Sequence, residues 1–137
     1  MLPALRVVAV LHALSFFLQP IMAGLFLSGQ DSAIDMHATN AMILVTLCLV
    51  MTILAVLAWR RSLVSRRVFS QSLALLIFEI LQVFAGVQHI MWLHIPLGVL
   101  MMGGIAQLMP ELMGSKPKPA EEPTASVVAF PAAEAGE

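Results

Sequence analysis

Two histidines stand at the start of hydrophobic segments and are candidates for binding a metal-containing cofactor. His37 and His94 each follow a short turn, and each opens a long stretch without Asp, Glu, Lys or Arg. Two neutral imidazoles that face each other across an apolar slot can serve as the axial ligands of a b-type haem. The pattern therefore predicts that His37 and His94 face a shared centre, where a cofactor can lie between them. The competing interpretation is that both are interfacial histidines without a ligand.

Each of these histidines follows a glutamine and a glycine in the preceding hydrophobic segment. A glutamine side chain can donate a hydrogen bond, and a glycine allows a helix or a flat ligand to approach closely. The repeated order predicts two related helical hairpins that bring both histidines toward a shared centre. The two sets are Gln19, Gly24 and His37, and Gln82, Gly86 and His94.

Three further ionisable residues, His12, Glu79 and His89, are candidates for a polar relay. Unpaired polar groups are costly in hydrocarbon, so such residues usually face the bundle interior and often mark function. At about 1.5 Å per residue, His12 and Glu79 differ in depth by only about 5 Å, so we expect them to be in contact. Three roles for Glu79 are compatible with this position: a proton-relay group, a quinone contact, or a protonated carboxyl that is hydrogen-bonded to its neighbours. His89 lies at a helix end near water, which favours His94 as the ligand.

The elements that position these residues are four hydrophobic segments. The chain has 137 residues, of which 60% are hydrophobic and 11% charged. Because a membrane-spanning helix needs about 20 apolar residues, we predict spans over about 4–28, 36–59, 68–89 and 93–112. This is an all-α, integral membrane four-helix bundle covering residues 1–113. Cys48 is the single cysteine, so neither a disulfide framework nor a thiolate metal site is expected.

The basic residues predict the orientation in the membrane. Arg6, the arginines between the second and third spans, and Lys116 and Lys118 fall on one side, whereas Asp31 and Asp35 fall on the other. By the positive-inside rule, both termini are cytoplasmic and the chain is a multi-pass protein of the inner (cytoplasmic) membrane. Residues 114–137 are rich in Pro, Ala and Glu and are predicted to be a disordered cytoplasmic tail.

The outgoing Gln and Gly followed by a returning His-x-x-x-Ala, here His37 to Ala41, resemble the repeated unit of haem A synthases. Those enzymes consist of two four-helix halves, and each half holds a haem between histidines on its second and fourth helices. The chain is similar to one half over about residues 11–108. The resemblance implies that His37 and His94 are axial haem ligands. Ile34 and Ala38 replace the family's glutamate and arginine, so catalysis on the haem is not expected.

The sequence thus favours a small membrane protein that binds haem b and acts in electron transfer or haem handling beside a respiratory complex. Membrane lipid and a respiratory complex or quinone are the expected partners, and nucleic acid is not. The alternative is a cofactor-free accessory or assembly subunit of a membrane complex. A transporter is less favoured, because one bundle offers no evident alternating repeat. The oligomeric state is left open.

Overall fold

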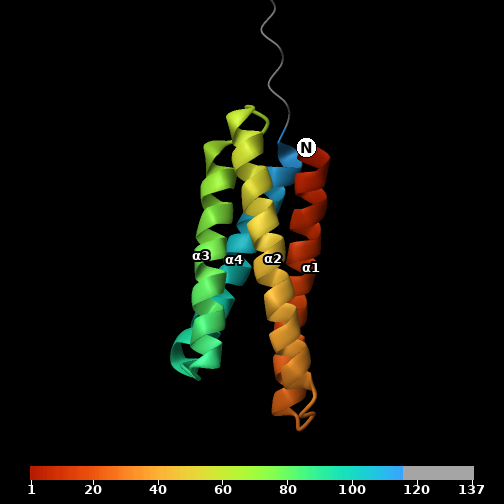
Figure 1. Ribbon diagram of the computed structural model, residues 1–137, viewed down its shortest axis with the longest axis vertical. Helices are drawn as coiled ribbons and strands as arrows, with labels where there is room; N and C mark the ends of the chain where they lie inside the picture. The colour runs from red at the N-terminus through yellow and green to blue at the C-terminus, as the bar shows by residue number, and fades with distance from the viewer. Residues whose placement is uncertain (116–137) are drawn as a thin grey trace, which may run out of the picture.

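The computed structural model describes residues 1–115, which form a bundle of four helices (Figure 1). The predicted all-helical class is confirmed. The boundaries lie close to the predicted spans, and the largest difference is that α2 begins at Ala33 rather than at residue 36. The helices are α1 Leu2–Leu27, α2 Ala33–Arg60, α3 Arg66–Val87 and α4 Met91–Gly114.

The last helix runs further than the sequence predicted. α4 continues through Pro110 and ends at Gly114, where we expected the tail to begin. A proline inside a helix removes one backbone hydrogen bond, and packing against neighbouring helices makes this tolerable in a membrane protein. The remainder of the predicted disordered tail, residues 116–137, lies outside the described residues.

Within residues 1–115, each helix packs against the next along the chain, and α1 also packs against α4. The diagonal pairs, α1 with α3 and α2 with α4, have no close backbone approach in this part of the chain. The N-terminus, the turn between α2 and α3, and the end of α4 lie at one end of the bundle (Figure 1). Toward the opposite end the hairpin of α1 and α2 diverges from the hairpin of α3 and α4.

The apolar side chains divide into an inner core and an outer surface. Leu5, Met51 and Leu108 are almost completely buried between the helices. Many other large apolar side chains, such as Leu14 and Val99, are more than half exposed on the outside of the bundle. All four helices are long and apolar enough to cross a membrane. An apolar exterior on such helices is the surface that lipid covers, so the chain has the properties of a multi-pass membrane protein.

Arg6 connects the first helix to the end of the last one. Its guanidinium donates hydrogen bonds to the backbone carbonyl oxygens of Leu112, Met113 and Ser115, at 3.2, 3.0 and 2.6 Å. The last carbonyls of a helix have no partner within the helix, and they carry partial negative charge. Arg6 therefore closes this end of the bundle by capping α4.

Replacing Arg6 by Gln should lower the free energy of unfolding in detergent by about 1–2 kcal/mol, because the α4 carbonyls lose a charged donor. Arg61→Gln is the matched control, since Arg61 is exposed in the turn at the same end of the bundle. Thermal unfolding followed by circular dichroism measures both variants. Equal stability of the two variants would contradict the capping role.

Candidate functional site

A cavity of about 230 Å³ lies in the half of the bundle where the two hairpins diverge. All four helices contribute to its walls, which are mostly apolar and include Leu44 and Met101. Five of its lining residues carry polar side chains, and the sequence had singled out every one of them. They are Gln19, His37, Glu79, Gln82 and His94.

His94 is held in place by Gln82 through two hydrogen bonds between α3 and α4. The Gln82 side-chain nitrogen donates to the His94 carbonyl oxygen over 2.7 Å, and His94 Nδ1 lies 3.0 Å from the Gln82 carbonyl oxygen. Because a carbonyl oxygen can only accept, the second bond requires the proton on Nδ1. In this tautomer Nε2 is unprotonated, which is the state in which histidine binds a metal.

His37 meets Gln19 in the same way between α1 and α2. His37 Nδ1 lies 3.2 Å from the Gln19 carbonyl oxygen. The Gln19 side-chain amide can also be oriented so that its nitrogen lies 3.3 Å from the His37 carbonyl oxygen and 2.8 Å from His37 Nδ1. In this orientation the amide oxygen of Gln19 accepts a hydrogen bond from the Ala41 backbone nitrogen. Nδ1 of His37 can therefore donate to the carbonyl or accept from the amide. Only the first choice leaves Nε2 free to bind a metal, as at His94, and it requires the amide oxygen of Gln19 rather than its nitrogen to face Nδ1.

The two imidazoles come together across the bundle. Their ring centres are 6.1 Å apart and their planes are inclined by 57°. His37 and His94 come from opposite hairpins, so the packing of the hairpins sets this separation. A metal ion bonded at about 2 Å to the Nε2 atoms of two facing imidazoles places the ring centres about 6 Å apart. The separation of 6.1 Å fits one ion held between the two rings.

The glycines that the sequence singled out have different surroundings. A Cβ on Gly86 would lie 3.0 Å from His94 Cε1 and 3.1 Å from Nδ1, so only glycine leaves room for the ring. A Cβ on Gly98 would likewise lie 3.0 Å from the side-chain nitrogen of Gln82. Gly24 is exposed, does not line the cavity, and has no heavy atom of residues 1–115 within 4 Å of a Cβ position. The expected close approach is therefore found at Gly86 but not at Gly24.

His12 and Glu79 form the contact that their depths predicted. His12 Nε2 and Glu79 Oε1 share a hydrogen bond, and the residues are 1% and 3% exposed. The bond joins α1 to α3, which are diagonal partners in the bundle. Glu79 also lines the cavity, so the pair lies at the cavity's inner end.

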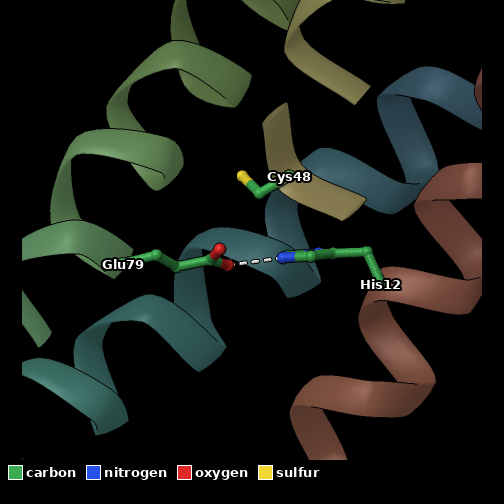
Figure 2. A group of neighbouring side chains, drawn as sticks. All are labelled: His12, Cys48 and Glu79. Atoms are coloured by element: carbon green, nitrogen blue, oxygen red, sulfur yellow. Dashed lines mark hydrogen bonds and ion pairs between the residues drawn. The ribbon is translucent and has the colours of Figure 1, made fainter. Parts of the chain in front are cut away.

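Cys48 completes a cluster that sequence reasoning missed. Figure 2 shows His12, Cys48 and Glu79 converging from three helices. Their metal-ligating atoms all lie within 4.8 Å of one another, and Cys48 is 0% exposed. Cys48 shares the inward face of α2 with His37 and Asn40, and that shared face was the only signal available in the sequence.

The other predicted residues lie away from the cavity. His89 is exposed in the turn between α3 and α4, with φ +55°, and it does not line the cavity that Glu79 lines. Met42 and Phe84, apolar residues on the helices that carry His37 and Gln82, are 60% and 55% exposed on the outside of the bundle. Their positions are explained by helix rotation, which turns Leu44 inward instead of Met42.

No protein-family model matches the chain, and no curated protein or solved structure matches it. The fold and site define a class: an all-helical bundle with four helices able to cross a membrane and a polar-lined cavity between its hairpins. The resemblance to haem A synthases stays a prediction based on sequence.

Replacing His12 by Leu should lower the free energy of unfolding in detergent by about 3 kcal/mol, because Glu79 then loses its buried partner. Glu79→Gln in the His12→Leu background should recover at least about 1 kcal/mol, since the amide carries no charge. A double-mutant cycle in denaturant measures the coupling, and His89→Leu serves as an exposed control. Strict additivity of His12→Leu and Glu79→Gln would show that the contact contributes nothing.

Proposed function

We propose that this protein binds a b-type haem in the cavity, with His37 and His94 as the axial ligands. The observation that carries the proposal is the pair of contacts from Nδ1 to a backbone carbonyl, one in each hairpin, at 3.2 and 3.0 Å. Metal-ligating histidines almost always donate their other ring nitrogen to such an acceptor, which fixes the tautomer and the ring direction. The separation of 6.1 Å between the ring centres supports the same assignment.

A haem bound here would supply one-electron chemistry at its iron. The chain's own part is to hold the two imidazoles, to exclude water and to place a proton-carrying group nearby. Leu44, Val83 and Met101 provide apolar cavity walls that would keep water away from the bound haem. Glu79 is the only carboxyl among the cavity-lining residues, and its bond to His12 allows a proton to pass between them.

The same proposal includes a repeated architecture. In both hairpins the histidine Nδ1 on the returning helix lies against the backbone carbonyl oxygen of the glutamine on the outgoing helix, His37 against Gln19 and His94 against Gln82. This supports two related hairpins that each orient one ligand. The cavity lies at the end of the bundle opposite the arginine-containing turn, so the positive-inside rule assigns it to the outer half of the membrane, with both termini in the cytoplasm.

The role we infer is electron transfer or haem handling beside a respiratory complex, with quinone as a candidate partner. A catalytic role on the haem is not proposed. The positions where the haem A synthase family has a glutamate and an arginine are occupied by Ile34 and Ala38, and both side chains are exposed rather than directed into the cavity.

The full-length protein, purified in mild detergent from haem-sufficient cells, should show a Soret and an alpha band in its dithionite-reduced minus oxidised spectrum. His37→Ala and His94→Ala should each remove the six-coordinate spectrum, because each deletes one axial ligand. Added imidazole should restore it in both variants if they are folded. His89→Ala, at the exposed turn, is the control and should keep the wild-type spectrum.

A colourless wild-type protein that also fails to take up added haem would overturn haem binding and favour a cofactor-free subunit. Spectra that survive both His37→Ala and His94→Ala would place the haem elsewhere.

Gly86→Ala should weaken haem binding by about 10-fold to 100-fold, because a methyl group would displace the His94 ring from its orientation. Gly24→Ala is the matched control: it is also a glycine to alanine change in an outgoing helix, but it adds a methyl group in open space. Haem titration in detergent gives both affinities. Equal losses in the two variants would contradict a role for Gly86 in positioning His94.

A further inference from the structure

The cluster of His12, Cys48 and Glu79 has the donor set of a transition-metal site. It offers an imidazole nitrogen, a thiol sulfur and a carboxylate oxygen, all within 4.8 Å of one another. A tetrahedral zinc ion holds its donors roughly 3–4 Å apart, so small side-chain adjustments bring all three onto one ion. The donors come from α1, α2 and α3, and the packed helices therefore hold them in place (Figure 2).

A second observation points to a ligand at this cluster. Glu79 is 3% exposed, yet its Oε2 atom has no hydrogen-bond partner among the described residues. Buried carboxylate oxygens are rarely left without a partner, particularly in hydrocarbon where water cannot supply one. Oε1 of the same carboxylate already bonds His12, so the side chain is fixed and the free oxygen remains available within the cluster.

The charges also fit a divalent cation. Cys48 as a thiolate and Glu79 as a carboxylate balance the two positive charges, and His12 binds as a neutral imidazole. The loaded site then has no net charge, which is the favourable state inside a membrane. On binding, the ion displaces the thiol proton and the proton shared by His12 and Glu79. Two protons leave the site as one divalent ion enters, so charge is conserved.

Glu79 gives such an ion a route into the bundle. It lines the cavity, whereas Cys48 and His12 are not part of the cavity wall. An ion entering through the cavity would meet the carboxylate first and the two inner donors next. With three protein ligands, a fourth position remains for water or for a group that enters from the cavity.

We propose that His12, Cys48 and Glu79 form a binding site for a single divalent transition-metal ion, with zinc as the ion that the donor set fits best. Hard cations such as Mg²⁺ are disfavoured by the thiolate, and a purely soft ion gains little from the carboxylate. This site uses donors other than His37 and His94, and its assignment does not rest on haem binding.

Cobalt is a suitable probe, because Co²⁺ bound to a thiolate has a charge-transfer absorption and tetrahedral Co²⁺ has intense visible bands. The full-length protein in detergent is treated with a chelator and titrated with Co²⁺. Both signals should appear, saturate at one ion per chain and disappear when Zn²⁺ is added. Since Cys48 is the chain's only cysteine, a thiolate signal identifies the site without ambiguity.

Cys48→Ala should abolish the charge-transfer band, and Glu79→Gln or His12→Gln should weaken Co²⁺ binding at least about 10-fold. His89→Ala is the control and should leave the titration unchanged. A Zn²⁺-dependent rise in the unfolding temperature of the wild type, absent in Cys48→Ala, gives an independent readout. The haem spectrum of Cys48→Ala should be unaltered, which separates this proposal from the previous one.

Two results would overturn the metal site. The first is a wild-type protein that shows no thiolate band and no retained zinc by elemental analysis. The second is stoichiometric metal binding of unchanged affinity in a folded Cys48→Ala variant, which would place the ion on other donors.

Discussion

The hydrogen bond between His12 and Glu79 is the interaction on which the rest of the structure depends. Inside hydrocarbon a polar side chain must find its partner within the protein, and a carboxyl at mid-helix has the greatest need of one. This bond joins α1 to α3 across the diagonal of the bundle, where the backbones do not approach each other. It therefore fixes how the first hairpin lies against the second at the level where they begin to diverge.

The two halves of the bundle, on either side of this link, are packed differently. On the basic side, Leu5, Val68 and Leu112 fill the space between the helices and leave no exposed surface. On the other side, the polar contacts run within each hairpin: Gln82 holds His94, and Ser15 exchanges two hydrogen bonds of 2.8 Å with Asn40. Because these polar groups find partners inside their own hairpin, they do not pull the hairpins together, and a cavity remains between them.

The sequence predicts the order and length of the helices and the depth of their residues, but not the rotation of each helix about its own axis. Hydrophobic length gave four helices, and depth alone paired His12 with Glu79, since a buried carboxyl has few candidates at its own level. Gly24 and Gly86 show where this reasoning ends. Gly86 follows Gln82 by four residues and shares its face, whereas Gly24 follows Gln19 by five, which turns it about 100° further round the helix. Cys48 was missed for a related reason: its nearness to Glu79 depends on the packing of three helices.

Glu79 connects the two proposed sites, because its side chain belongs to the cluster and also lines the cavity. Oε1 bonds His12 at the cluster, while the side chain also forms part of the cavity wall beside Gln82. A change of charge in the cavity therefore acts on Glu79, the carboxyl that also bonds His12. Conversely, a metal ion bound by His12, Cys48 and Glu79 removes the proton that Glu79 could deliver to the cavity. In so apolar an environment such charges are weakly screened. Occupancy of the two sites is therefore linked through the protonation state of Glu79. A cavity occupant that requires protonated Glu79 opposes metal binding. A cavity occupant that favours the Glu79 carboxylate promotes metal binding.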